Sequence, residues 1–130
     1  MNYLLDTNAV IAFQKRNPRM AAALRRVAVD TVFVSSIVMF ELYFGAMKGT
    51  KRNYSFGELG RLPFRSLEFT DTDALKAGQI RDDLRRRGEP IGPYDMLIAG
   101  QALARDLTVV TRNVREFGRV PELRVENWEG

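Results

Sequence analysis

The sequence predicts an α/β fold, a three-layer α/β/α sandwich around a mainly parallel central sheet. Short apolar runs, such as residues 2–5 and 107–111, alternate along the chain with amphipathic helical patterns. Strands that alternate with helices are joined by right-handed crossovers, which make neighbouring strands parallel. Residues 107–111 are also too apolar to leave one face of a sheet in water. Because there is no linker or internal repeat, we expect a single domain spanning residues 1–130.

The first half of the chain carries clear capping signals. Pro18 suits the first turn of a helix, which we expect to end near Asp30. Ser35 and Ser36 precede a strongly apolar helix that Gly49 closes. The predicted elements of this half are strand 2–5, helix 9–16, helix 18–30, strand 31–34, helix 37–47 and a less regular helical segment at 51–62.

The second half contains a long polar helix and a shorter apolar one. The run from Thr70 to Asp73 is typical of a helix amino terminus, and Pro90 and Pro93 bound a loop before the next helix. A β-branched run then predicts a buried strand. The predicted elements are strand 64–69, helix 71–87, helix 94–105, strand 107–111 and a short final strand at 124–128.

Composition excludes several kinds of chemistry. The chain has no cysteine and no histidine, so thiolate metal sites, thiol nucleophiles, histidine bases and the usual zinc sites are ruled out. Any hydrolytic chemistry must therefore depend on carboxylates, hydroxyl groups, lysines or a hard metal ion. The net charge of +4 points weakly toward a polyanionic partner such as nucleic acid.

The apolar patterns of the sequence also indicate where in the cell the protein is expected. No run of about 18 apolar residues could span a bilayer, so we expect no membrane association. The first residues lack a basic start, and Asp6 interrupts the only amino-terminal apolar run. We therefore expect a cytoplasmic protein.

Three acidic residues stand out as candidate ligands. Asp6 directly follows a buried strand, Glu41 lies amid apolar residues in a helix, and Asp95 falls in the first turn of another helix. Each also has a structural interpretation: a helix cap for Asp6, a salt bridge or an exposed position for Glu41, and ordinary stabilisation of a helix dipole for Asp95. Ligands of open parallel sheets bind outside the carboxyl ends of the strands, where Asp6 and the segment after Thr111 are expected.

Converging carboxylates provide a site for a hard cation. Mg²⁺ and Mn²⁺ bind oxygen, and Mg²⁺ typically takes one or two protein carboxylates together with waters and phosphate oxygens. Such ions can activate water for phosphodiester hydrolysis without histidine. The residues thus suggest a metal-dependent phosphodiesterase with Asp6, Glu41 and Asp95 as catalytic and metal-binding groups.

Four segments together resemble the PIN-domain ribonucleases of the VapC toxin type. They are Leu4-Leu5-Asp6-Thr7-Asn8, the mid-helix Glu41, the run from Tyr94 to Ala99, and the run from Val110 to Phe117. Their order and spacing cover nearly the whole chain, although each piece alone is a weak signal.

This resemblance implies a PIN-like fold and an Mg²⁺-dependent endoribonuclease, with Mn²⁺ as a substitute, that acts as the toxin of a toxin–antitoxin pair. It also implies a cognate antitoxin, a homodimer and a toxin–antitoxin hetero-oligomer. Asp6 and Asp95 would be the direct metal ligands, with Glu41 completing the cluster. Thr7, Asn8 and Thr111 would orient ligands or waters.

Asn113 departs from the family pattern, because many PIN domains carry a fourth acidic residue at this position. An amide has no negative charge with which to hold a second cation, so the departure argues against a two-metal site and is compatible with a single ion; the number of ions stays open. Asn113 has an alternative role as the cap of a short helix at 114–117. We treat it as a supporting residue.

The basic clusters and the alternative functions have weaker support in the sequence. Arginines near residue 85 and cations near residue 51 could contact RNA, but solvated helix ends and packed aromatic residues explain them as well. The alternative function is a non-catalytic PIN-like domain that binds RNA or protein. A phosphatase that uses an aspartyl nucleophile would want Asp-x-Asp, whereas this chain has Asp6-Thr7-Asn8. Which RNA is cut does not follow from the sequence.

Overall fold

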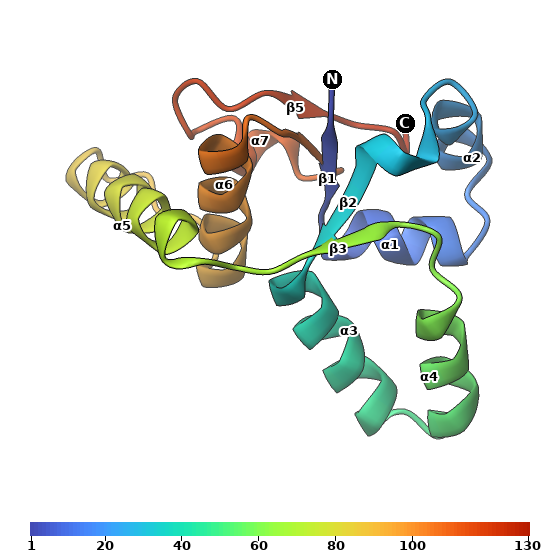
Figure 1. Ribbon diagram of the computed structural model, residues 1–130. Helices are drawn as coiled ribbons and strands as arrows, with labels where there is room; N and C mark the ends of the chain where they lie inside the picture. The colour runs from blue at the N-terminus through green and yellow to red at the C-terminus, as the bar shows by residue number, and fades with distance from the viewer.

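A computed structural model describes residues 1–130 and contains one five-stranded parallel sheet. The strands lie in the order β3-β2-β1-β4-β5, with β1 in the centre (Figure 1). The chain runs from β1 to β2 and β3 and then returns to β4 on the other side of β1. Right-handed crossovers in these two directions place helices on opposite faces of the sheet. The strands are β1 (Tyr3–Leu5), β2 (Val32–Ser35), β3 (Arg65–Leu67), β4 (Thr108–Val110) and β5 (Val125–Glu126).

Seven α-helices surround the sheet, and several of them pack as pairs. Helices α3 and α4 form a hairpin that extends away from the sheet, and α5 lies along α6 (Figure 1). A 3-10 turn at Val29–Thr31 leads into β2. The helices are α1 (Thr7–Gln14), α2 (Pro18–Leu24), α3 (Ser36–Lys48), α4 (Arg52–Gly60), α5 (Asp71–Arg86), α6 (Pro93–Arg105) and α7 (Val114–Phe117).

The predicted fold class is confirmed, and most elements lie where the sequence patterns indicate. One helix is wrong in length: α2 ends at Leu24 rather than near Asp30. Its last turn is closed by the backbone N–H of Arg25, which donates to the carbonyl oxygens of Ala21 and Ala23. The apolar spacing beyond Leu24 therefore reflects side chains that pack on the core from a turn, not from a continued helix.

The α5–α6 pair depends on a close backbone approach. A Cβ atom built on Gly100 of α6 would lie 2.6 Å from the Cβ of Ala77 on α5, which no real pair of carbon atoms tolerates. Glycine at this position thus lets the two helices touch. Since α6 also carries Asp95 in its first turn, the contact helps to fix the position of that carboxylate.

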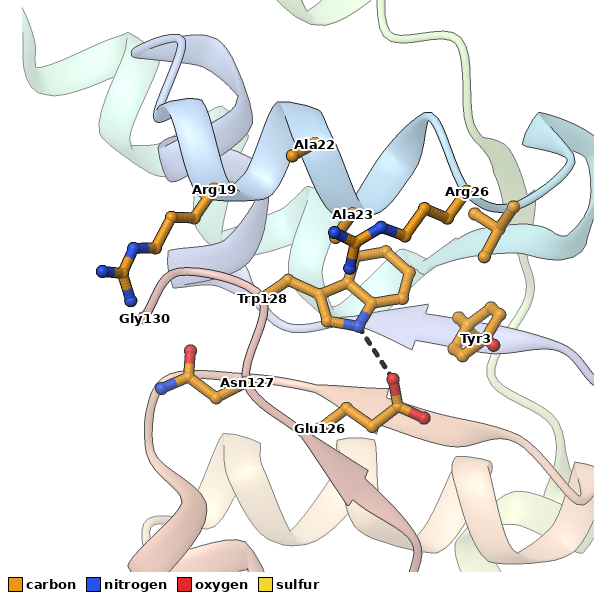
Figure 2. A pocket seen from close by; sticks show the side chains of 10 residues that line it. Tyr3, Arg19, Ala22, Ala23, Arg26, Glu126, Asn127, Trp128 and Gly130 are labelled. Atoms are coloured by element: carbon orange, nitrogen blue, oxygen red, sulfur yellow. Dashed lines mark hydrogen bonds between the residues drawn. The ribbon is translucent and has the colours of Figure 1, made fainter.

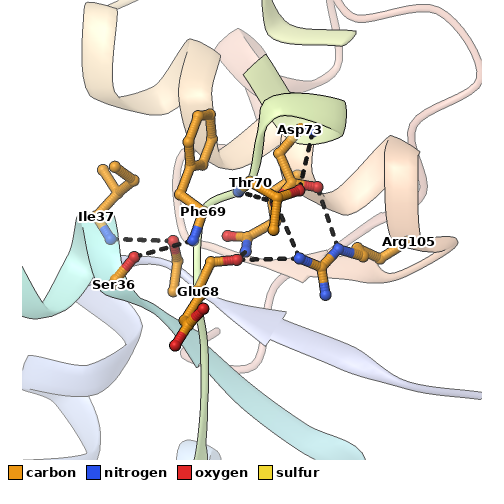
Figure 3. A network of polar contacts seen from close by, with 9 residues as sticks. Ser36, Ile37, Glu68, Phe69, Thr70, Asp73 and Arg105 are labelled. Atoms are coloured by element: carbon orange, nitrogen blue, oxygen red, sulfur yellow. Dashed lines mark hydrogen bonds and ion pairs between the residues drawn. The ribbon is translucent and has the colours of Figure 1, made fainter. Parts of the chain in front are cut away.

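A buried polar network fastens this helix pair to the end of β3 (Figure 3). Asp73, which is fully buried, accepts hydrogen bonds from Arg105 Nε and Nη2, each at 3.1 Å. Asp73 and Thr70 also form a reciprocal capping box at the start of α5. Arg105 Nη2 and Gln101 Nε2 each donate to the carbonyl oxygen of Glu68 at 3.0 Å. The Asp73 carboxylate is therefore fully used by the fold.

The last residues fold back over the start of β1 (Figure 2). The indole ring of Trp128 lies 4.9 Å from the ring of Tyr3, and its Nε1 donates to Glu126 Oε1 at 2.9 Å. A cavity of about 570 Å³ opens beside Trp128, with Arg19 and Arg26 of the α2 region on its rim. This cavity lies at Tyr3, the first residue of β1, and contains none of the predicted site residues.

None of the seven helices combines the length and the apolar character needed to cross a membrane.

Candidate active site

The candidate site forms where β1 and β4 end side by side. Leu5 and Val110 are paired in the parallel register, so the next residues, Asp6 and Thr111, emerge together at the carboxyl edge of the sheet. The backbone N–H of Asp6 donates to Val110 O at 3.1 Å, which continues the pairing by one residue. Two segments more than 100 residues apart in the chain thereby meet at one point.

Asp6 is 3% exposed and serves two structural contacts at once. Its Oδ1 accepts the backbone N–H of Ala9 at 2.8 Å, and its Oδ2 accepts the hydroxyl of Thr111 at 2.5 Å. Burial raises the pKa of Asp6 above its ordinary value, and the charges of Glu129 and Glu41 add to this, although the two hydrogen bonds oppose the increase. The capping role considered from the sequence is thus real, and the same carboxylate also lies in the acidic cluster.

Thr111 and Asn113 hold the turn that follows β4. Thr111 is fully buried, and its Oγ1 accepts the backbone N–H of Asn113 at 2.9 Å while donating to Asp6. Asn113 precedes α7, but its side chain caps no backbone group. Its Nδ2 instead donates to Glu116 Oε2 at 2.9 Å. Both predicted supporting residues therefore contact acidic groups of the site.

Glu41 is partly buried on α3 and is held by Thr7, whose hydroxyl donates to its Oε1 at 2.7 Å. No arginine or lysine forms an ion pair with Glu41, so the salt-bridge interpretation is wrong. Asn8 differs from its neighbour Thr7, because it is exposed and its side chain makes no hydrogen bond. The structure thus connects Thr7, but not Asn8, to the acidic residues.

Asp95 lies in the first turn of α6 and is only partly exposed. Burial raises its pKa most, followed by the negative charges of Asp6 and Glu116, a carboxyl–carboxyl hydrogen bond with Glu116, and the charge of Glu41. Together these effects raise the pKa of Asp95 to about 6. The three predicted ligands therefore lie close enough for their charges to repel one another.

Glu116 is an acidic residue of the site that the sequence reasoning missed. It lies on α7, three residues after Asn113, and its carboxylate both contacts Asn113 and raises the pKa of Asp95. A fourth acidic side chain is thus present although Asn113 carries no charge. The i, i+3 spacing of Asn113 and Glu116 on a short helix is the signal that could have identified it.

Glu129 is a second acidic residue that we did not predict here. Its charge contributes to the raised pKa of Asp6, and its Oε2 is buried without a hydrogen-bond partner. It belongs to the segment that follows β5. The negative field around Asp6 therefore comes from three directions: α3, α6–α7 and the final segment.

The acidic side chains form a loose cluster, since no three of them are gathered tightly enough to make a preformed cage for a metal ion. The donors are nevertheless of the kind that a hard cation prefers, because all of them are carboxylate or hydroxyl oxygens. None of Asp6, Glu41, Asp95 and Glu116 is paired with a cationic side chain. A divalent ion with its own waters would relieve the repulsion, so these residues fit such an ion.

Comparison with known sequences gives a consistent assignment. The sequence profile described as the PIN domain matches residues 3–123. The "tRNA(fMet)-specific endonuclease VapC" of Salmonella typhimurium is 39% identical, over 98% of each chain. The "Ribonuclease VapC2" of Rickettsia felis is 38% identical, over 99% of each chain.

Solved structures resemble the fold closely. The chain superposes on the DNA-bound VapBC complex from Salmonella typhimurium with a TM-score of 0.92 and 34% identity, covering 98% of both chains. The complex VapBC2 from Rickettsia felis, bound to a DNA fragment from its promoter, gives the same TM-score and identity over 98% of this chain and 99% of that one. The similarity includes the whole sheet and the helices that carry the acidic residues.

Proposed function

The chain belongs to the PIN-domain family, among its VapC ribonucleases, and we propose that it is a metal-dependent endoribonuclease that hydrolyses RNA phosphodiester bonds at the acidic cluster. The observation that carries the proposal is the gathering of Asp6, Glu41, Asp95 and Glu116 without any cationic partner. Burial, together with the charges of the neighbouring acids, raises the pKa of Asp95 to about 6. Unpaired negative charge of this kind is costly unless a ligand compensates it.

Asp6 and Asp95 would hold the ion directly, with Glu41, which Thr7 fixes, completing the set and Glu116 lying beside Asp95. A divalent cation such as Mg²⁺ or Mn²⁺, when bound, supplies positive charge that stabilises the phosphate and activates water for attack. The protein supplies the orientation. Because Asp6 is tied to Ala9 N–H and to Thr111, its carboxylate has little freedom to rotate away from the site.

The proposed physiological role is that of the toxin in a cytoplasmic toxin–antitoxin pair. The relatives named above include VapC ribonucleases, and their solved structures are VapBC complexes. A cognate antitoxin would stop cleavage by covering the acidic cluster. Exposed apolar side chains on α3 offer a surface for protein partners, including a second copy of this chain in a homodimer: Phe40, Phe44 and Met47.

The test is cleavage of purified RNA by the isolated protein in Mg²⁺, Mn²⁺ or EDTA. Transfer RNA is the first substrate to try, because a relative is named for it. We expect cleavage with either metal and none in EDTA, and loss of cleavage in Asp95→Asn. The matched control is Asp71→Asn, which removes an exposed carboxylate from the first turn of α5 and should leave cleavage unchanged.

RNA binding without cleavage by the folded native protein in every metal tested would overturn the nuclease assignment. It would favour the non-catalytic alternative, in which the domain only binds RNA or a protein. Equal loss of cleavage in Asp95→Asn and Asp71→Asn would show that general charge, rather than the cluster, supports activity.

A further inference from the structure

The tip of the α3–α4 hairpin carries positive charge that no acidic side chain neutralises. Residues 42–57 include three cationic side chains, Lys48, Lys51 and Arg52, and no acidic one. All three are exposed, and none of them forms an ion pair. Lys48 Nζ lies 5.2 Å from the centre of the Phe44 ring, so the positive charge most available to a ligand is that of Lys51 and Arg52.

The arginines at the end of α5, by contrast, are paired with acidic side chains. There, Arg85 and Arg86 pair with Asp82 at 2.8 and 3.1 Å, and Arg87 pairs with Asp83 at 3.3 Å. Those arginines are neutralised within their own helix. The tip contains cations alone, and a cluster without compensating acids is typical of a surface that binds an anion.

Aromatic side chains accompany these cations. Tyr54 is 65% exposed, and its hydroxyl donates a long hydrogen bond of 3.5 Å to Glu58 Oε1. Phe56, by contrast, stacks on Tyr43 at 5.6 Å and is used in packing the hairpin. Arg52 is positioned by a hydrogen bond from its Nε to Met47 O at 2.9 Å, which leaves its terminal nitrogens free. An exposed ring beside oriented cations suits a base and its phosphates.

Two concave surfaces that share Tyr54 lie between the tip and the acidic cluster. A cavity of about 420 Å³ at the tip is lined by residues from Gly49 to Tyr54. A second cavity of about 370 Å³, between α1, α3 and α4, is also lined by Tyr54 and extends to Thr7 and Glu41. Gly45 lines this second cavity, and a Cβ atom there would meet nothing within 4 Å, so the cavity has free space at this residue.

We propose that the tip of the α3–α4 hairpin is a second contact site for single-stranded RNA, in which Tyr54 stacks on a base while Lys51 and Arg52 bind phosphates. Tyr54 lines both cavities, and one of them reaches Glu41, so RNA could run from the acidic cluster to the tip through these cavities. Lys48 lies seven residues after Glu41 on α3, about 10 Å along the helix axis. An RNA strand bound at the acidic cluster thus reaches the tip only when it extends several nucleotides beyond the scissile phosphate. The inference rests on the proposed nuclease function for the identity of the ligand.

The experiment compares single-stranded oligoribonucleotides of about four and about twelve nucleotides, with binding measured by fluorescence anisotropy in EDTA. The variant Lys51→Ala/Tyr54→Ala should bind the longer RNA roughly tenfold more weakly and the shorter RNA as the native protein does. The matched control is Arg25→Ala/Leu75→Ala, which removes an exposed cation and an apolar side chain that is also 65% exposed. It should bind both RNAs like the native protein.

Salt dependence gives an independent measure. Each lost phosphate contact reduces the slope of log affinity against log salt concentration by about 0.7 for a single strand, so Lys51→Ala should show this decrease with the longer RNA. Unchanged binding of the longer RNA, or an equal loss for both lengths, would overturn the proposal. If the native protein binds the longer RNA through the tip but cleaves nothing in Mg²⁺ or Mn²⁺, the nuclease proposal fails and the tip site stands. If it cleaves while the tip variant binds normally, only the tip site fails.

Discussion

Two buried carboxylates in this protein are used in opposite ways. Asp73 is enclosed by Arg105 and a capping box (Figure 3), whereas Asp6 at the end of β1 has only Thr111 and a backbone N–H as partners and faces other acids. Burial alone would raise the pKa of Asp73, but the hydrogen bonds and charge of Arg105, together with Thr70, hold it below its ordinary value. The pKa of Asp6 is raised.

The comparison shows how a structural acid differs from one that awaits a ligand. A carboxylate that serves the fold has its countercharge inside the protein, so its ionised form is already stable. A carboxylate that binds a cation lacks that countercharge inside the protein, and other acids nearby increase the free-energy cost of its ionised form. Helix position does not distinguish them, because Asp73 and Asp95 both lie in the first turn of a helix.

The sharpest test makes the same substitution at both buried sites. Asp6→Asn should lower the rate of RNA cleavage by a factor of roughly 10² to 10³, because it removes a carboxylate that would hold the metal ion beside the reacting phosphate. The amide oxygen can still accept the Ala9 N–H, so the variant should fold. Asp73→Asn should retain the native cleavage rate per folded molecule. A folded Asp6→Asn variant with the native rate would remove Asp6 from the catalytic site.

Breaking the Asp73 pair should affect folding instead. Arg105→Ala leaves a fully buried carboxylate without its cation, which should reduce the free energy of unfolding by about 3 kcal/mol. Urea denaturation followed by circular dichroism measures this loss. Arg124→Ala is the control, since its ion pair with Asp106 is exposed and should contribute little. Equal effects of the two substitutions would contradict the structural role assigned to Arg105.

Asp95 and Asp73 should also make opposite contributions to the pH dependence of stability. The folded pKa of Asp95, about 6, exceeds its ordinary 3.8, so the native state holds its proton to higher pH and stability decreases as pH rises through this interval. The pKa of Asp73 is lowered, so its contribution is present above about pH 4 and is lost as pH falls.

In metal-free protein, Asp95→Asn should therefore increase the free energy of unfolding at pH 7 by about 2 kcal/mol and have little effect at pH 4. Thermal unfolding at both pH values in EDTA measures this difference. Destabilisation at pH 7 would mean that the Asp95 charge is compensated by the protein, as that of Asp73 is.

The smallest expected effect concerns the hydroxyl that supports Asp6. Thr111→Val preserves shape but removes the 2.5 Å hydrogen bond to Asp6, which should cost about 1.5 kcal/mol of unfolding free energy. It should also raise the pKa of Asp6 further and so move the acid limb of the pH–cleavage profile upward. Thr108→Val, on the strand that precedes Thr111, removes a hydroxyl with no link to the cluster and should leave that limb in place. Identical pH profiles of the two variants would show that Thr111 only supports the fold.

Much of the fold was predictable because its signals are local. Apolar runs and alternating patterns predicted all five strands, and the run from Thr70 to Asp73 predicted the start of α5, where the structure adds a capping box. The early end of α2 was not predictable in this way, since apolar spacing records which side chains face the core and not whether they do so from a helix or a turn.

The sequence by itself determined the α/β class and the three acids Asp6, Glu41 and Asp95, because each follows from a pattern within a few neighbouring residues. Only the tertiary structure decided which acids meet. The pairing of β1 with β4 brings Thr111 to Asp6, and α7 adds Glu116 beside Asp95. Charges interact through space, so neither the raised pKa of Asp95 nor the absence of a countercharge can be inferred until the strand order is known.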